Sequence, residues 1–134
     1  EPTMNKYFGA AILICILAIG CRHDEHTVIG GKGGNAGVIV YPHHHHVATH
    51  LINFTIYVKY NTSDAPANGV YDDSLTCTNH DSLVSATFTG LKNGIYYFFG
   101  KGYDTSIAQD VKGGAPYTVA VQQTQSMELA VTED

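Results

Sequence analysis

Histidine is the residue type whose number and spacing in this chain most favour a chemical role. The chain contains eight histidines, and four of them are consecutive at positions 43–46, directly after Pro42. Neutral imidazole nitrogens bind zinc, copper and nickel, so the run predicts a site for one of these metals. On an extended segment alternate side chains point to opposite sides, so each alternate pair could chelate one ion. The predicted pairs are His43 with His45 and His44 with His46, and the full set of predicted ligands is His43, His44, His45, His46, His50 and His80.

The residues around the run decide how it is presented. Pro42 is expected to end the strand before it, because proline donates no backbone hydrogen bond. The histidines should then cross an exposed loop at one end of the domain. Their spacing differs from that of a closed zinc site, which draws pairs from two elements with about three to five residues between histidines. A solvated loop that binds metal only adventitiously therefore stays open as an alternative.

A second group of reactive residue types lies in the segment from Asn61 to Ser82, which is predicted to be a long polar connection. The spacing of Cys77 and His80 could place a thiolate and an imidazole on one ion, or a thiol beside a base. No oxyanion hole or third orienting group accompanies them, so no catalytic residue and no enzyme is predicted. Asp72, Asp73 and Asp81 are interpreted as turn formers. Alternatively, oxygen ligands for calcium could come from Asn61, Asp64, Asp72 and Asp73.

The composition predicts a single domain made of strands. Asp and Glu outnumber Lys and Arg by 12 to 7, and the basic residues are scattered, so nucleic acid is not an expected partner. Glycine, threonine, tyrosine, valine and isoleucine are common, a balance that favours strands and turns over helices. One hydrophobic core is expected at this chain length.

Alternation of apolar and polar residues predicts the strands. From Leu51 to Tyr60 the even-numbered side chains form a mostly apolar face and the odd-numbered ones a mostly polar face. Further strands are predicted near 38–41, 84–88, 95–99, 117–121 and 127–132, and turns at Asn68-Gly69, Asn93-Gly94, 30–34 and Gly113-Gly114. The pattern predicts an all-β fold, a single antiparallel β-sandwich of about seven strands over residues 35–134.

The first residues resemble a secretion signal. Lys6 precedes an uncharged, mostly apolar run at 8–19, which is too short to span roughly 30 Å of hydrocarbon comfortably. The segment at 17–21 resembles the bacterial lipobox, which implies that Cys21 receives a lipid and that the signal helix of residues 1–20 is removed. Residues 1–3 precede Met4 and are not expected to be native.

A lipid on Cys21 would hold the chain to a membrane of the bacterial cell envelope, with the outer membrane expected and its periplasmic or surface face left open. Residues 21–34 are polar and glycine-rich and are expected to form a flexible tether. The pair Asp24-Glu25 resembles the acidic signal of surface lipoproteins of Bacteroidetes, and an ordinary solvated linker is the alternative. With Cys15 in the signal and Cys21 lipidated, Cys77 has no disulfide partner.

The stretch from Phe88 to Asp104 resembles the signature of carboxypeptidase-regulatory-like, or prealbumin-like, domains. Its features are a strand with a phenylalanine, then Leu91, then a hairpin at 94–96 and a strand that ends near Gly102-Tyr103. The resemblance implies a β-sandwich that serves folding, docking or surface display and that seldom acts as a catalyst.

Within this stretch the residues have expected structural roles. Leu91 should fill the core beneath the turn, and Gly94 should permit the chain reversal. Tyr97 and Phe99 should share one face of their strand, with the Phe99 ring in the core.

The predicted function is that of a lipid-anchored, extracytoplasmic, non-catalytic β-sandwich module that binds copper, zinc or nickel through its histidine-rich loop. The alternative is a surface or adhesion accessory domain that docks another envelope protein and has no metal role. That contact would use the sheet edge or exposed tyrosines such as Tyr71, Tyr96 and Tyr103.

Overall fold

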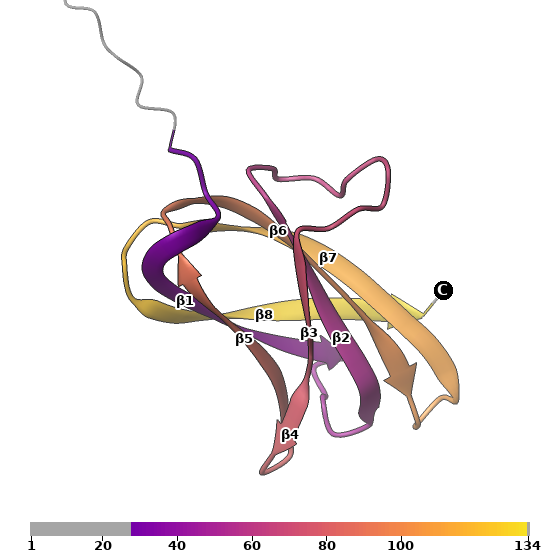
Figure 1. Ribbon diagram of the computed structural model, residues 1–134. Coiled ribbons are helices and arrows are strands. Elements are labelled where there is room, and N and C mark those ends of the chain that lie inside the picture. The colour runs from indigo at the N-terminus through magenta and orange to yellow at the C-terminus, as the bar shows by residue number, and fades with distance from the viewer. Residues whose placement is uncertain (1–27, 134) are drawn as a thin grey trace, which may run out of the picture.

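The chain folds as an all-β domain, which confirms the predicted fold class. The computed structural model describes residues 28–133, and these form eight strands (Figure 1). The strands are β1 (Lys32–His44), β2 (Leu51–Tyr60), β3 (Asp73–Thr76), β4 (Thr78–His80), β5 (Leu83–Leu91), β6 (Gly94–Asp104), β7 (Gln109–Val119) and β8 (Thr124–Glu133). Within residues 28–133 no helix is long and apolar enough to cross a membrane.

The strands form one sheet that is rolled nearly into a barrel, rather than the expected clear sandwich. Their order is β3-β2-β6-β7-β8-β1-β5-β4, and the pairing is antiparallel except between β1 and β8, which run parallel. The sheet consists of two halves of four strands that meet where β7 joins β8. Among residues 28–133 that seam has two residue pairs, Val111 with Glu133 and Lys112 with Thr132.

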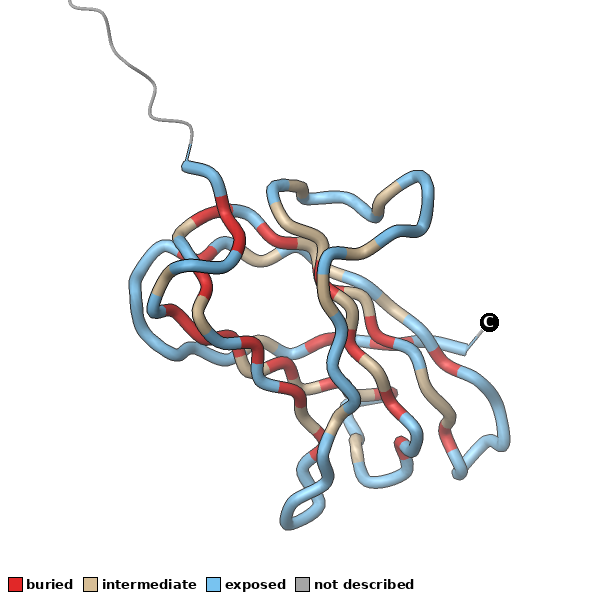
Figure 2. The backbone as a smooth tube through the Cα atoms, viewed as in Figure 1, coloured by how far each residue is buried: buried red, intermediate tan, exposed pale blue. Residues whose placement is uncertain are grey.

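The core is built from alternate residues of nearly every long strand, seen as repeated buried bands in Figure 2. The predicted apolar faces of β5 and β8 are confirmed, since Val84, Ala86, Phe88, Leu129 and Val131 are all buried. The buried hydrophobic residues are Ala36, Val38, Val40, Leu51, Phe54, Ile56, Val58, Val84, Ala86, Phe88, Leu91, Tyr96, Phe98, Val111, Val119, Leu129 and Val131.

A bulge near the start of β2 modifies its predicted face. The register with β6 shifts between Ile52 and Thr55, and Asn53 adopts a φ of 51°. The bulge moves Leu51 into the core and leaves Ile52 with 45 % of its surface exposed, whereas the alternation predicted that Ile52 would lie inside.

The link between β5 and β6 is not the hairpin that the resemblance implies. β5 lies between β1 and β4, while β6 lies between β2 and β7, so residues 92–93 carry the chain from one half of the sheet to the other. Leu91 is fully buried at this crossing, as expected. Gly94 has a φ of 153°, and a Cβ there would come within 2.7 Å of the Cα of Gly30.

The aromatic run of β6 places different rings in the core than the sequence suggested. Tyr96 and Phe98 are fully buried, whereas Tyr97 and Phe99 share the opposite, half-buried face. The assignment of Phe99 to the core is therefore wrong, and Phe98 takes that place. The shared face of Tyr97 and Phe99 is confirmed.

The ordered domain begins earlier than predicted. β1 starts at Lys32, and the amides of Gly30 and Gly31 donate to Asn61 Oδ1 (2.6 Å) and Tyr96 Oη (2.7 Å). The expectation of a flexible tether or turn is therefore wrong for residues 30–34. The predicted signal peptide, Cys21 and the rest of the tether up to residue 27 lie outside the described residues.

Two further segments differ from expectation because distant strands pair with them. The segment 61–82 contains β3 and β4 instead of being a continuous loop. Gly113 and Gly114 lie inside β7 and not in a turn. A Cβ on Gly113 would clash with the carbonyl oxygen of Ala130, so glycine is needed there for β7 to approach β8.

Candidate metal centre

The strand before the histidines continues through the proline. Pro42 lies inside β1, is fully buried, and pairs with Leu129 of β8. The pairing of β1 with β5 stops at Val40, so Pro42 has a strand neighbour on one side only. A residue without an N–H is tolerated at such an edge. The expectation that Pro42 ends the strand is therefore wrong, and β1 reaches His44.

A tight turn follows at His45 and His46. The amide and carbonyl of His44 exchange two hydrogen bonds of 2.9 Å with those of Val47. His45 and His46 both have positive φ, 47° and 65°, which is the signature of a type I′ turn. Histidine is one of the few residues besides glycine that is enriched in this conformation.

The turn changes which histidines are neighbours. The ring centroids of His44 and His45 lie 4.0 Å apart, and those of His43 and His46 lie 5.5 Å apart in a stacked arrangement. The predicted alternate pairs, His43 with His45 and His44 with His46, are wrong because the run is not extended beyond His44.

His44 is buried between two carboxylates. Its side chain is only 3 % exposed, with Nδ1 lying 2.7 Å from Asp104 Oδ2 and Nε2 lying 2.8 Å from Glu133 Oε2. The three residues end β1, β6 and β8, which meet at one end of the barrel. The expectation that the whole run is exposed is therefore wrong for His44.

Asp104 is held in place by the turn that follows it. Its Oδ1 accepts hydrogen bonds from the Ser106 amide (2.8 Å) and hydroxyl (2.5 Å). These bonds, and the bond from His44, lower the pKa of Asp104 to about 2 despite its burial. Asp104 is therefore an anion that accepts the Nδ1 proton of His44, which directs Nε2 toward Glu133.

The two carboxylates favour the protonated form of His44. Hydrogen bonds to Asp104 and then to Glu133 raise the pKa of His44, although burial opposes them. The pKa of Glu133 is lowered, first by a backbone hydrogen bond and then by His44. A proton and a metal ion would therefore compete for the same Nε2 atom.

His44, His45 and Glu133 form a possible metal-binding group. One ligand atom from each lies within 4.8 Å of the others. Asp104 would not touch the ion, but it would fix the orientation of His44 as carboxylates do for metal-bound histidines. His45 and Glu133 are exposed, so an ion could reach the group from solvent.

Comparisons with protein-family models, curated proteins and solved structures find no match to this chain.

The other predicted ligands lie apart from this group. His43 is half-buried beside Glu128, and His46 is exposed at the turn. His50 is exposed, and its carbonyl oxygen accepts bonds from the Thr105 amide (3.0 Å) and hydroxyl (3.1 Å). His80 is exposed at the end of β4, and its nearest charged partner is Asp81 at 2.9 Å. Of the six predicted ligands, the possible group joins only His44 and His45.

The sequence did not indicate Asp104 or Glu133. Both are separated from His44 along the chain, by 60 and 89 residues, and the parallel pairing of β1 with β8 brings Glu133 near. The only local signal is that Asp104 ends a strand and precedes Ser106, a common arrangement in turns.

The surroundings of Cys77 disfavour its thiolate form. Burial raises the pKa of the half-buried Cys77 thiol to about 11, so the thiol is protonated at neutral pH, unlike a reactive thiolate. The carboxylate of Asp72 already accepts bonds from Lys59 Nζ (3.3 Å) and the Tyr60 amide (2.7 Å). Asn61 Oδ1 likewise accepts a hydrogen bond from the Gly30 amide (2.6 Å). Because these oxygens already accept hydrogen bonds, they do not favour a calcium site.

Proposed function

We propose that this chain is a non-catalytic binding module of the bacterial cell envelope that holds a transition-metal ion through His44, His45 and Glu133. The observation that carries the proposal is the buried His44 ring. Asp104 occupies one of its nitrogens, and the other nitrogen faces a carboxylate and a second imidazole.

The ligand set favours a borderline metal such as zinc, copper or nickel. Two imidazoles and one carboxylate are typical ligands of these ions, and oxygen-loving calcium and magnesium seldom use imidazole. Three protein ligands leave further coordination positions for water or another donor.

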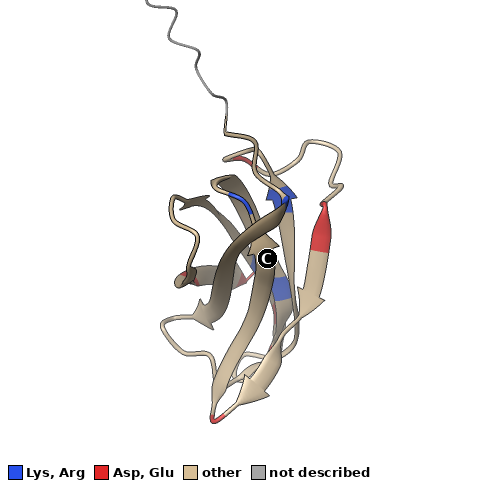
Figure 3. Cartoon of the chain, turned by 60° about the vertical axis from the view of Figure 1, so that its left-hand side comes forward, with Lys and Arg blue, Asp and Glu red and all other residues tan. Residues whose placement is uncertain are grey.

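Binding is a better proposal than catalysis for this group. The groove nearest to the turn is lined by Tyr41, His43, Glu128 and other residues, but by none of the three proposed ligands. The lysines of residues 28–133 appear as separate spots in Figure 3, which does not favour a nucleic-acid partner.

The experiment is calorimetric titration of the metal-free chain with Zn²⁺ and Cu²⁺ at pH 7.4. We expect the tightest binding event to weaken at least tenfold in Glu133→Gln and in His45→Ala, both of which alter exposed side chains. His50→Ala is the matched control and should bind as the unaltered chain does. Equal tight binding in the double variant His45→Ala, Glu133→Gln would refute the proposal.

We also propose that Cys21 attaches the module to the membrane. The lipobox-like segment at 17–21 supports this, and two or three acyl chains bind a membrane far more firmly than one. Cys21→Ser should abolish incorporation of labelled fatty acid, and Cys77→Ser should leave it unchanged. Equal labelling of the Cys21 variant would show that the anchor lies elsewhere.

A further inference from the structure

We infer that the turn carries a second, weaker metal site on its other side, formed by His43 and Glu128 and completed by His46. It shares no residue with the site proposed at His44, and its location can be tested separately.

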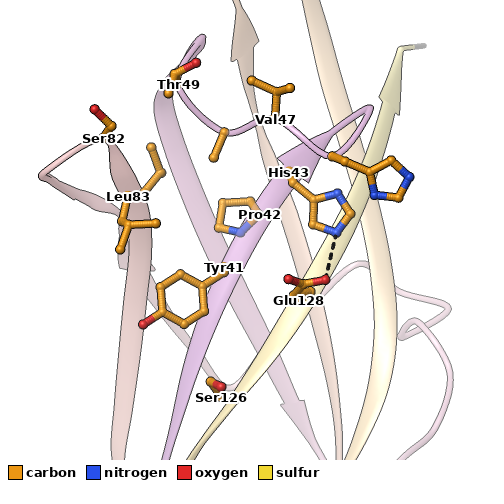
Figure 4. Close-up of a pocket in the computed structure, with 12 residues that line it drawn as sticks. Tyr41, Pro42, His43, Val47, Thr49, Ser82, Leu83, Ser126 and Glu128 are labelled. Atoms are coloured by element: carbon orange, nitrogen blue, oxygen red, sulfur yellow. Dashed lines mark ion pairs between the residues drawn. The ribbon is translucent and has the colours of Figure 1, made fainter.

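The main support for this site is the distance between the His43 imidazole and the Glu128 carboxylate. His43 Nε2 lies 3.8 Å from Glu128 Oε2, and Figure 4 shows the imidazole and the carboxylate facing each other. This gap is too long for a hydrogen bond. Two ligand atoms on one tetrahedral zinc ion, each at about 2 Å from the metal, lie roughly 3.3 Å apart. A shift of about half an ångström would therefore let one ion bridge the gap between Nε2 and Oε2.

Neither ring nitrogen of His43 has a hydrogen-bond partner among the described residues. Nδ1 is buried without one, and Nε2 faces only the distant carboxylate. Buried polar atoms without partners are rare in folded proteins. An ion on Nε2 would give the ring one polar contact on the side of Glu128, while Nδ1 keeps no partner.

Glu128 is a free carboxylate at the rim of a groove. Its side chain is 80 % exposed, and within residues 28–133 its only ion-pair partner is His43. The groove has a volume of about 520 Å³ and an apolar wall that includes Pro42, Val47 and Leu83 (Figure 4). An ion can therefore reach this carboxylate directly from solvent.

His46 can supply the third ligand. Its ring stacks on that of His43 with the planes 15° apart, and it also lines the groove. It is exposed in the turn, so rotation about its side-chain bonds can bring a nitrogen toward the ion.

Strand parity explains why there are two sites. His43 and His44 are adjacent in β1 and point to opposite faces. Glu128 and Glu133 are five residues apart in β8, an odd number, so they also point to opposite faces. Each face of the β1–β8 pair therefore presents one histidine of β1, one glutamate of β8 and one histidine of the turn. The second site is the weaker because no residue plays the role of Asp104 at Nδ1 of His43.

The test is the stoichiometry and location of Zn²⁺ and Cu²⁺ binding to the full chain. Calorimetry with Zn²⁺ should resolve two ions per chain. Glu128→Gln should weaken the second event at least tenfold and leave the first unchanged, and Glu133→Gln should do the reverse. His50→Ala should change neither. A single ion per chain, lost in the Glu133 variant, would overturn the second site and leave the first intact.

Paramagnetic Cu²⁺ gives the location independently. The first equivalent should broaden the amide resonances of Thr105 and Ser106, near the His44 site. The second should broaden those of Leu83 and Ser126, which line the groove. Broadening of the groove resonances that persists unchanged in the double variant His43→Ala, Glu128→Gln would also overturn the inference.

Discussion

His43 and His44 are neighbours in one strand, yet their rings have opposite surroundings. Both nitrogens of His44 contact carboxylates within 2.8 Å, and the side chain is almost completely buried. The His43 side chain is 18 % exposed, and neither of its nitrogens has a hydrogen-bond partner among the described residues. The residues on the neighbouring strands, and not the histidine run itself, decide what each ring can do. Phe98 and Phe99, which are neighbours in β6, differ in the same way, since Phe98 is fully buried and Phe99 is half-buried.

The largest expected effect comes from the phenylalanine pair. Phe98 is fully buried, so Phe98→Ala should destabilise the domain by about 3–5 kcal/mol through lost burial and a cavity. Phe99 is half-buried against Tyr57 and Tyr71, so Phe99→Ala should cost clearly less. Urea unfolding of both variants measures the difference. An equal loss of unfolding free energy in the two variants would mean that Phe98 and Phe99 are buried to the same extent.

The histidine pair should show the next largest difference. His44→Ala leaves Asp104 near Glu133 with no cation between them, and removing one partner of a buried charged group is strongly destabilising. The melting temperature should fall by roughly 10 °C, whereas His43→Ala should lower it by only about a few degrees. Thermal melts with a chelator present exclude a contribution from metal. A larger fall in the His43 variant would contradict the assigned burial.

The pH dependence of stability should depend on His44 and not on His43. Protonated His44 stabilises the fold fully below its unfolded pKa of 6.5, and this contribution is lost as pH rises through its raised folded pKa. The Asp104 contribution is present above 3.8 and is lost as pH falls toward 2. Metal-free stability should therefore be highest between these limits, from 3.8 to 6.5.

Melts from pH 3 to pH 9 check this profile. His44→Ala should remove the decline above pH 6.5, and His43→Ala should keep it. A decline of the same size in both variants would assign the titration to another group.

The smallest effects concern metal affinity. Asp104→Asn should weaken Zn²⁺ binding at the His44 site by about 10–100-fold, because the orienting carboxylate is lost. Ser106→Ala removes one of the two donors to Asp104 Oδ1 and should weaken binding less. Calorimetry at pH 7.4 gives both values. An unchanged affinity in Asp104→Asn would mean that His44 Nε2 is not a ligand.

The sequence predicted the parts of this fold that depend on local pattern. Alternation predicted the bounds of β2 and the buried faces of β5 and β8, and the turn context predicted the buried Leu91. The histidine run indicated the region of the candidate metal centre. These features follow from residue type and spacing over a few positions.

The remaining features depend on contacts between distant segments. The parallel pairing of β1 with β8 extends β1 through Pro42 and places Glu133 near His44. The bulge at Ile52 and the crossing after Leu91 likewise depend on register and strand order. No residue pattern within one strand specifies its neighbour, so Asp104 and Glu133 could not be found in advance.

The contacts of His44 with Asp104 and Glu133 form late in folding. His44 contacts residues that are 60 and 89 positions away along the chain, and such non-local contacts form late because long loops must close first. A chain that lacks β8, whether still emerging from a ribosome or cut short, has no Glu133 to offer. The cluster of His44, Asp104 and Glu133 therefore forms only once β8 has paired with β1. Under the proposed function, a bound metal ion would report that this pairing is in place.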